Sequence, residues 1–465
     1  MASKVIEVTS PFTEEVVHRA EAISADAVDI VVSRARVAYQ HWRATPLVTR
    51  KALCERVVAW FEANQERIAE DITRQMGKPL GQARGEVGGL MERANHMIAI
   101  ADETLADDAV AEKEGFTRYI RHEPLGVVLD IAAWNYPLLI AVNVVIPAVL
   151  AGNSVIVKHS SKTPLCATAF EDAFRASDGP EHLVQAVAAD HGVTELLIKH
   201  EGVDHVSFTG SVSGGRQVNR SASDRFIEVG LELGGKDPAY VCADADFDWA
   251  VGNCVDGAFY NAGQSCCAVE RIYVEAPIYD KFVEAYAAKA RDYVVGDPMD
   301  DKTSMGPLAS KGAIDFLKKQ VADAVSAGAR LVVSPDEFTT PDKGYFLAPA
   351  VVADAPQDCS LMQDESFGPV IGIAKVSGDE EATRYMNDSP YGLTASIWTS
   401  DTERAIRIGE QVETGTFFMN RCDCLDPALP WCGVKNTGRG ATLSAYGLLG
   451  FTRLKSMHLR TEIPT

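Results

Sequence analysis

Two adjacent cysteines and a distant glutamate are the side chains of this sequence best suited to covalent chemistry. The segment N-A-G-Q-S-C-C-A occupies residues 261–268 and follows E-L-G-G-K at residues 232–236. A thiol that follows small, flexible residues can be accessible on a turn, and a carboxylate on a second turn can fold against it. The two segments therefore predict a cysteine nucleophile, Cys266 or Cys267, with Glu232 as a base.

The composition indicates a full-sized globular protein. The chain has 465 residues, of which 46% are hydrophobic and 23% charged, and its 44 basic and 65 acidic residues give a formal net charge of −21. This length suggests roughly three domains or lobes. Because a dispersed negative charge repels phosphate backbones and anionic membranes, we expect neither a nucleic-acid partner nor a membrane partner.

The sequence favours a cytoplasmic protein without a metal site. Its first ten residues lack the apolar stretch of a secretory signal, and its longest apolar tract, residues 137–150, is too short for a spanning helix. Ten cysteines are scattered without a C-x-x-C pair, which indicates a reducing compartment. Cys422, Cys424 and Cys432 fit no zinc-binding spacing.

The elements that must position the candidate groups alternate between helical and strand patterns. Apolar residues recur at helical spacing over residues 25–43, 48–76 and 81–105, which predicts a helical layer in the first hundred residues. Short apolar runs then predict strands at 116–121, 126–131, 154–157 and 205–208. Helix-length stretches at 138–150 and 163–176 lie between them.

A second series of predicted strands begins after residue 232. The strands are expected at 239–242, 271–274, 331–333, 370–373 and 395–398, with helices near 278–293 and 311–327. Alternation of strand and helix predicts a doubly wound α/β sheet followed by a second α/β lobe.

Seven short motifs follow one another along the chain. They are W-N-Y-P at 134–137, A-G-N-S-V-I-V-K at 151–158, F-T-G-S at 208–211, E-L-G-G-K at 232–236, N-A-G-Q-S-C at 261–266, E-S-F-G-P at 365–369 and P-Y-G-L at 390–393. In this order they resemble the motifs of the aldehyde dehydrogenase superfamily over nearly the whole chain. A chance match to one motif says nothing about the next, so their shared order is strong evidence.

The resemblance implies an α/β fold of three parts. A Rossmann-like cofactor domain would comprise residues 1–104 and 124–231, an α/β catalytic domain residues 232–445, and a small β oligomerisation element residues 105–123 and 446–465. In the family, the tail of one subunit meets its partner at this element. We therefore expect a homodimer or a homotetramer.

The resemblance also implies NAD(P)-dependent oxidation of an aldehyde to the free acid. Cys266 would form a thiohemiacetal and then a thioester, because an electron-poor carbonyl carbon releases hydride only after a nucleophile has added. Asn135 and the backbone N–H of Cys266 would hold the alkoxide. Glu232 would activate the hydrolytic water and favours release of a free acid over transfer to coenzyme A. Cys267 would line the pocket.

By the same resemblance, the cofactor would contact residues near the ends of several strands. A turn rich in glycine and hydroxyl groups at a helix start can present N–H groups to a pyrophosphate. Ser161 stands where many NAD-preferring members carry a glutamate that would repel a 2′-phosphate, so we expect NADP to be accepted at least as well as NAD. The implied cofactor contacts are Trp134, Lys158, Ser161, Gly210, Ser211, Gly215, Leu233, Glu365 and Phe367.

The implied substrate channel suits a small or medium apolar or aromatic aldehyde. Succinate-semialdehyde members usually carry an arginine at the position of Asn143, so its absence argues against a dicarboxylic semialdehyde, unless Arg421 replaces it. The glutamate of the family's proton relay falls on Thr442, so any relay would pass through water or be absent. The implied lining residues are Tyr136, Ile140, Asn143, Ser265, Cys267, Leu425 and Trp431.

Two other function classes remain open. A cysteine hydrolase or acyltransferase would need a histidine base, but no histidine lies in or near the motif of Cys266. The chain could also be a catalytically silent homologue. The presence of Cys266, Glu232 and Asn135 together argues against that alternative.

Overall fold

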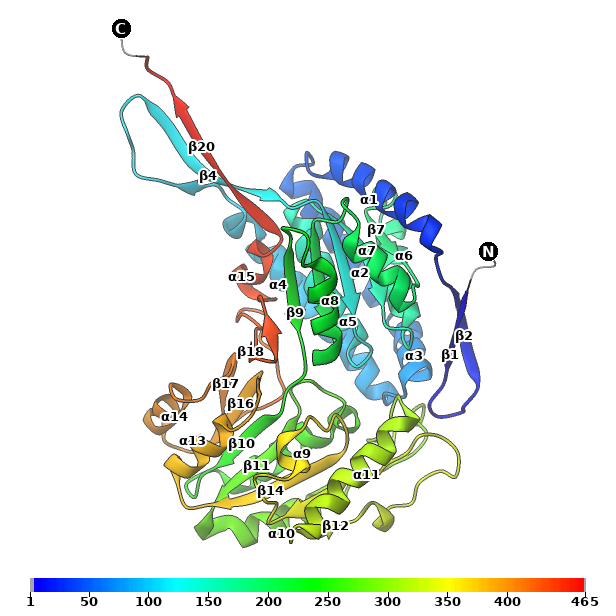
Figure 1. Ribbon diagram of the computed structural model, residues 1–465, viewed down its shortest axis with the longest axis vertical. Helices are drawn as coiled ribbons and strands as arrows, with labels where there is room; N and C mark the ends of the chain where they lie inside the picture. Colours follow the sequence, from blue (N-terminus) through cyan, green and yellow to red (C-terminus); the bar gives the residue numbers. More distant parts are fainter. Residues whose placement is uncertain (1–3, 464–465) are drawn as a thin grey trace.

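The computed structural model describes residues 4–463 and contains two α/β lobes and a projecting arm of long strands (Figure 1). Residues 1–3 of the predicted cofactor domain and residues 464–465 of the predicted oligomerisation segment lie outside this range. The α/β fold expected from the sequence is confirmed.

The upper lobe in Figure 1 is built on a six-stranded sheet with the order β19-β9-β8-β5-β6-β7. Its five parallel strands are β5 (Val127–Ala132), β6 (Ser154–His159), β7 (Val184–Ala186), β8 (His205–Thr209) and β9 (Glu228–Glu232). Every residue of β5 and β6 is buried, as expected for parallel strands that helices cover on both faces. The covering helices are α5 (Pro137–Ala151), α6 (Pro164–Ala176), α7 (His191–Lys199) and α8 (Val212–Ala222).

The helical layer of this lobe differs from the prediction in two places. The helix expected at 48–76 is broken into α2 (Leu47–Ala63) and α3 (Gln65–Met76) at Asn64, whose side chain donates to the Trp60 carbonyl in competition with the helix ladder. An unpredicted hairpin, β1 (Val5–Thr9) and β2 (Val16–Glu21), precedes the layer and is mostly exposed, so it lacks a buried apolar pattern. The remaining helices are α1 (Val28–Trp42) and α4 (Leu80–Thr104).

The second lobe contains a seven-stranded sheet with the order β12-β13-β14-β11-β10-β16-β17. The five strands predicted after residue 232 are present, whereas β13 and β17 were not predicted. The strands are β10 (Asp237–Val241), β11 (Val269–Glu275), β12 (Arg330–Val333), β13 (Ala350–Ala353), β14 (Val370–Val376), β16 (Thr394–Trp398) and β17 (Thr416–Met419). Its helices are α9 (Phe247–Phe259), α10 (Tyr279–Ala290), α11 (Lys311–Ser326), α12 (Ser360–Gln363), α13 (Asp379–Asn387) and α14 (Thr402–Gly409).

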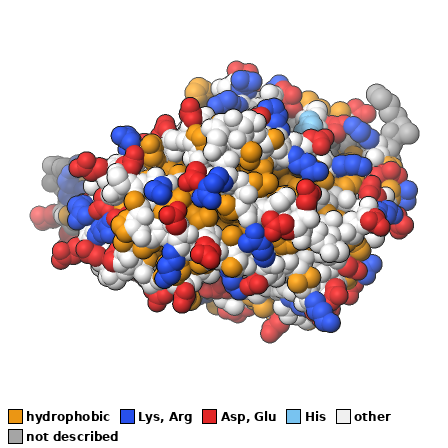
Figure 2. Space-filling model, turned by 90° about the horizontal axis from the view of Figure 1, so that it is seen from below, with side chains coloured by type: hydrophobic (Ala, Val, Ile, Leu, Met, Phe, Trp, Pro, Cys, Tyr) orange, Lys and Arg blue, Asp and Glu red, His pale blue; other side chains and the backbone are white. Residues whose placement is uncertain are grey.

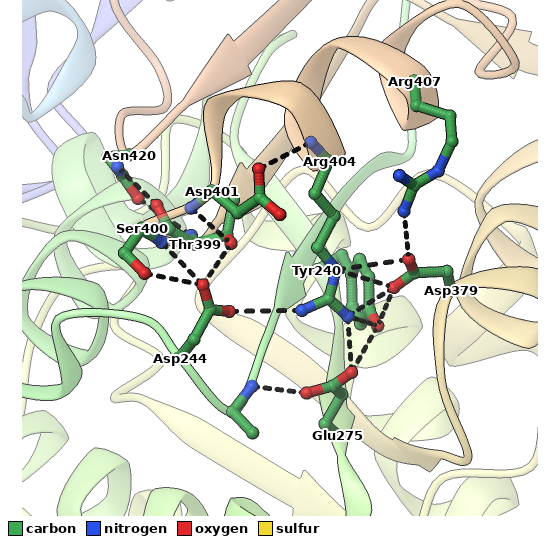
Figure 3. A network of polar contacts seen from close by, with 11 residues as sticks. Tyr240, Asp244, Glu275, Asp379, Thr399, Ser400, Asp401, Arg404, Arg407 and Asn420 are labelled. Carbon is green, nitrogen blue, oxygen red and sulfur yellow. Dashed lines mark hydrogen bonds and ion pairs between the residues drawn. The ribbon is translucent and has the colours of Figure 1, made fainter.

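An ion network fastens helices of this lobe to its sheet (Figure 3). The guanidinium of Arg404 on α14 donates to Asp244, Glu275 and Asp379, and its side chain is only 17% exposed. The Tyr240 hydroxyl from β10 lies within hydrogen-bond distance of both Asp379 and Glu275, at 2.9 and 3.1 Å. Because one arginine neutralises several carboxylates, α13, α14 and the ends of β10 and β11 are held together.

Short strands after residue 390 return the chain from the second lobe to the first. Strands β15 (Tyr391–Gly392) and β18 (Val434–Lys435) pair with each other, and β19 (Gly438–Arg439) pairs with β9. Strand β19 therefore completes the first sheet although it lies in the range predicted for the catalytic domain. Helix α15 (Ser444–Leu449) then leads to the arm.

The arm is a three-stranded antiparallel sheet of β3 (Asp108–Ala109), β4 (Phe116–Pro124) and β20 (Thr452–Arg460). It extends away from both lobes in Figure 1, and β20 is one of its edge strands. On the face seen in Figure 2, acidic and basic side chains are interspersed with hydrophobic ones. Within residues 4–463, no helix is both long and apolar enough to cross a membrane.

Candidate active site

A tight turn after α9 presents Cys266. Asn261, Ala262 and Gly263 have positive φ values of 52°, 56° and 69°, a rare left-handed run. A Cβ at Gly263 would lie 2.3 Å from the Gly368 carbonyl oxygen, so only glycine fits. The Asn261 side chain donates to the carbonyls of Asn135 and Gln264, each at 3.1 Å. The cysteine turn is therefore fixed against the W-N-Y-P and E-S-F-G-P segments.

The end of β9 brings Glu232 to the same place. The next residues pack closely against the cysteine turn, because a Cβ at Gly235 would lie 2.5 Å from the Cys266 carbonyl oxygen. Thr442 donates a hydrogen bond to Glu232 Oε1, and β19 positions it by pairing with β9. Burial raises the pKa of Glu232, opposed by the Thr442 hydroxyl and the positive charge of Arg93.

One cavity of about 290 Å³ contains the three predicted catalytic residues, Cys266, Glu232 and Asn135. Asn135 is 4% exposed, and its side-chain amide has no hydrogen-bond partner within residues 4–463, so it is free to donate. All seven residues predicted for the substrate channel line this cavity: Tyr136, Ile140, Asn143, Ser265, Cys267, Leu425 and Trp431.

The same cavity has an arginine that the sequence interpretation missed. Arg93 on α4 lines it and donates to the Asn143 side chain at 3.2 Å. Arg421, the replacement considered from the sequence, is exposed and donates to Cys424. The sequence interpretation considered an arginine only at residues 143 and 421, whereas the structure brings Arg93, on a different helix, into contact with Asn143.

The two adjacent cysteines have different surroundings. Cys267 is 4% exposed and lies 2.9 Å from Asp423 Oδ1, whereas Cys266 is partly exposed. A hydrogen bond with Cys266, burial and the Asp423 carboxylate raise the pKa of Cys267. Burial raises the pKa of Asp423 to about 7 despite hydrogen bonds from Cys267 and Ser265. Cys267 is therefore held as a neutral thiol, and Cys266 is the accessible sulfur.

A second cavity, of about 190 Å³, shares Asn135, Thr209 and Cys266 with the first. The rings of Trp134 and Phe367 meet edge to face at its border, 5.6 Å apart. Of the predicted cofactor contacts, six line it: Trp134, Gly210, Ser211, Leu233, Glu365 and Phe367.

The backbone around this cavity fits a phosphate-bearing ligand. Ser211 caps the start of α8, where its Oγ accepts from the Gly214 N–H at 3.1 Å, and helix starts attract anions. A Cβ at Gly215 would lie 2.6 Å from Leu233, so glycine permits α8 to pack against the end of β9.

The other two predicted cofactor residues lie at the carboxyl end of β6. Lys158 is 8% exposed, and burial lowers its pKa, whereas Ser161 is exposed in the turn before α6. Neither lines the second cavity, although Lys158 lies within β6 and Ser161 follows it, and β6 belongs to the same sheet as β8 and β9. The carboxyl ends of parallel strands are the usual ligand edge of such a sheet.

A buried ion pair, also missed from the sequence, holds the E-S-F-G-P loop. Lys236 Nζ lies 2.8 Å from Glu270 Oε2, and Glu270 accepts from the N–H groups of Ser366 and Phe367 at 2.8 Å each. Glu365 accepts from the Gly235 N–H, and burial together with Glu270 raises its pKa to about 7.

Within residues 4–463, no cluster of His, Cys, Asp or Glu is arranged to hold a metal ion.

Comparisons with known proteins agree with this geometry. A model of the aldehyde dehydrogenase family matches residues 1–457. Succinate-semialdehyde dehydrogenase [NADP(+)] 1 of Mycobacterium tuberculosis is 34% identical over 450 residues, which cover 96% of this chain and 98% of that protein. The solved structure of Gox0499 is 32% identical, with a TM-score of 0.94 over 98% of this chain and 99% of that one. Betaine aldehyde dehydrogenase of Staphylococcus aureus, solved with NAD+, is 27% identical, with a TM-score of 0.93 over 99% and 92%.

Proposed function

The chain belongs to the aldehyde dehydrogenase family, and we propose that it oxidises a small aldehyde to the free carboxylic acid through a covalent intermediate on Cys266. The observation that carries this proposal is the position of Cys266 at the junction of two cavities. One cavity can hold an aldehyde, and the other can hold the nicotinamide end of NAD or NADP.

In the first step, the Cys266 thiolate adds to the aldehyde carbon. The developing alkoxide needs hydrogen-bond donors, and the free amide of the buried Asn135 and the backbone N–H of Cys266 are proposed to supply them. Such donors typically contribute a few kcal/mol each, about 2.7–4 kcal/mol for one amide. Asn261 supports this role because it holds the Asn135 carbonyl next to the cysteine turn.

The second cavity suits the nicotinamide end of a dinucleotide, whose ring accepts hydride when bound. Trp134, Phe367 and Leu233 supply its apolar walls, and the start of α8 supplies N–H groups for phosphate. NADP or NAD is the cofactor, in line with the names of the mycobacterial and staphylococcal relatives. We propose that NADP is accepted at least as well as NAD, since the exposed Ser161 offers a hydroxyl and no repelling carboxylate.

Glu232 is proposed to draw a proton from the water that hydrolyses the Cys266 thioester. It lines the aldehyde cavity, and its raised pKa makes it a stronger base than an exposed glutamate. Thr442 replaces the relay glutamate of other members and donates to Glu232 rather than accepting its proton. The proton is then released from Glu232 to water.

The arm is proposed to join subunits. Strand β20 is an edge strand of nine residues and exposes Leu454 and Leu459, at 68% and 46%. An open edge with apolar side chains invites pairing with another chain. Light scattering after size-exclusion chromatography should give a dimer or tetramer, and a monomer at micromolar concentration would contradict the proposal.

The test of the reaction is reduction of NADP or NAD in the presence of an aldehyde panel. Cys266→Ala should abolish turnover, whereas Cys267→Ala, a matched change one residue away, should retain much of it. The proposal fails if the wild-type protein reduces neither cofactor with any aldehyde, or if Cys267→Ala is the inactive variant.

A further inference from the structure

Arg93 places a positive charge inside the aldehyde cavity. Arg93 is 9% exposed, and it is the only lysine or arginine among the described residues that line this cavity. A guanidinium stays protonated in proteins. Because a buried charge is costly without a partner, Arg93 needs an anion or a set of strong acceptors.

The protein satisfies this guanidinium only in part. Nη1 donates to the Leu139 carbonyl at 3.1 Å and to Asn143 Oδ1 at 3.2 Å, and both acceptors are neutral and lie on α5. Within residues 4–463, Arg93 forms no ion pair, and no acceptor is hydrogen-bonded to its Nε or Nη2. Two contacts therefore orient the group while other N–H donors remain free.

Three carboxylates near the cavity already accept hydrogen bonds from groups other than Arg93. Glu86 pairs with the buried Lys78 and accepts from the Leu138 N–H at 2.8 Å. Asp423 accepts from Ser265 and Cys267, and Glu232 accepts from Thr442.

Two further acids, Glu92 and Asp256, line the cavity but are exposed, where solvent screens them. The acids around the cavity therefore leave the guanidinium of Arg93 without a direct ionic partner.

We propose that Arg93 binds a carboxylate at the far end of the substrate, so that the enzyme prefers short carboxylated aldehydes to neutral aldehydes of the same length. This inference rests on the proposed oxidation at Cys266. A guanidinium fork matches a carboxylate in two parallel hydrogen bonds, and both are strengthened by charge.

The shape of the cavity agrees with a small, extended substrate. Its volume of about 290 Å³ is at the small end of ligand sites. Gly85 on α4 leaves its wall open, since a Cβ there would meet only the Tyr260 hydroxyl, at 4.0 Å. The aldehyde would reach Cys266 while the carboxylate meets Arg93 between α4 and α5.

The test compares three four-carbon aldehydes that differ in the far group. Succinate semialdehyde carries a carboxylate, butanal is neutral and 4-aminobutanal is cationic. We expect kcat/KM for succinate semialdehyde to exceed that for butanal by roughly 10- to 100-fold, the range of one charged hydrogen-bonded contact. A ratio near one, or a preference for 4-aminobutanal, overturns the inference while leaving the oxidation itself established. Reduction of neither cofactor with any of the three refutes the proposed function.

Variants assign the preference to one side chain. Arg93→Met should reduce the ratio of kcat/KM between succinate semialdehyde and butanal to within about threefold, mainly through a higher KM for the semialdehyde. Arg93→Lys, which keeps the charge, should give an intermediate ratio. Arg74→Met is the control, because Arg74 is an exposed arginine of α3 bonded to Glu70.

A binding measurement keeps the inference testable if turnover is lost. Succinate should inhibit butanal oxidation by the wild type in competition with the aldehyde, and succinate should bind folded Arg93→Met at least roughly tenfold more weakly by calorimetry. Equal losses for both aldehydes in Arg93→Met, with unchanged succinate binding, would show that Arg93 acts on Glu232 instead and would overturn the inference.

Discussion

Replacing Thr442 with valine should raise the pKa that governs thioester hydrolysis. The Thr442 hydroxyl donates to Glu232 and stabilises its ionised form. Without this hydroxyl, the increase in the Glu232 pKa that burial causes is less opposed. A hydrogen bond to a charged group is worth about 1.5–3 kcal/mol, and a change of one in pKa corresponds to about 1.4 kcal/mol. We expect the apparent pKa of Glu232 to rise by about one, because water replaces part of the lost hydrogen bond.

The assay must isolate the hydrolytic step. Rapid mixing of enzyme, cofactor and saturating aldehyde separates the initial burst of reduced cofactor from the later steady rate, which reports hydrolysis when a burst is present. The acidic limb of the steady rate, followed from about pH 5 to 9, gives the apparent pKa of the base. On that limb, Thr442→Val should be roughly tenfold slower than the wild type at the same pH, because about tenfold less of its Glu232 is ionised.

Thr442→Ser is the matched control, since it keeps a hydroxyl at the same atom and should retain the wild-type pH profile. An unchanged apparent pKa in Thr442→Val, with a normal burst and a folded protein, would refute the reasoning. It would mean that the pKa in the profile belongs to a group other than Glu232.

Three other predictions concern the turn, the buried acid and the cofactor. Gly263→Ala should abolish activity and lower the unfolding free energy by about 2 kcal/mol or more, because the alanine Cβ would lie 2.3 Å from the Gly368 carbonyl oxygen. Unchanged activity and an unchanged denaturant midpoint would contradict this prediction. Burial raises the pKa of Asp423 from 3.8 to about 7, so its ionisation should lower stability as pH rises from about 4 to 7. In Asp423→Asn, the loss of unfolding free energy over this pH range should be smaller than in the wild type by at most about 4 kcal/mol. Identical pH profiles of unfolding free energy for the two proteins would exclude the effect. Ser161→Glu should increase the preference for NAD over NADP by roughly tenfold or more in kcat/KM, and an unchanged ratio would show that Ser161 does not face the 2′-phosphate.

Much of the fold was predictable because buried parallel strands leave a local signal. Strands such as β5 and β6 are continuous apolar runs, since both faces are covered. The β1–β2 hairpin and the break at Asn64 were missed because exposed strands and a single side-chain hydrogen bond leave little trace in hydrophobic periodicity. Tertiary contacts decide those places.

The candidate groups of the proposed reaction could be read from residue types and local spacing. Cys266, Glu232 and Asn135 occur in ordered motifs, and the structure brings these motifs to one cavity. The reason is that each motif follows a strand or helix end, and glycines such as Gly235 permit the backbones to approach.

The electrostatics of the site, in contrast, arise from contacts between distant segments. Arg93 lies on α4, far from every motif in sequence, yet it reaches Asn143 across the α4–α5 contact. Likewise, Thr442 meets Glu232 only because β19 returns to pair with β9. Charge and hydrogen bonding act through space, so groups distant along the chain set the pKa of Glu232 and the charge inside the cavity, whereas a local motif was enough to single out Cys266 as the candidate nucleophile.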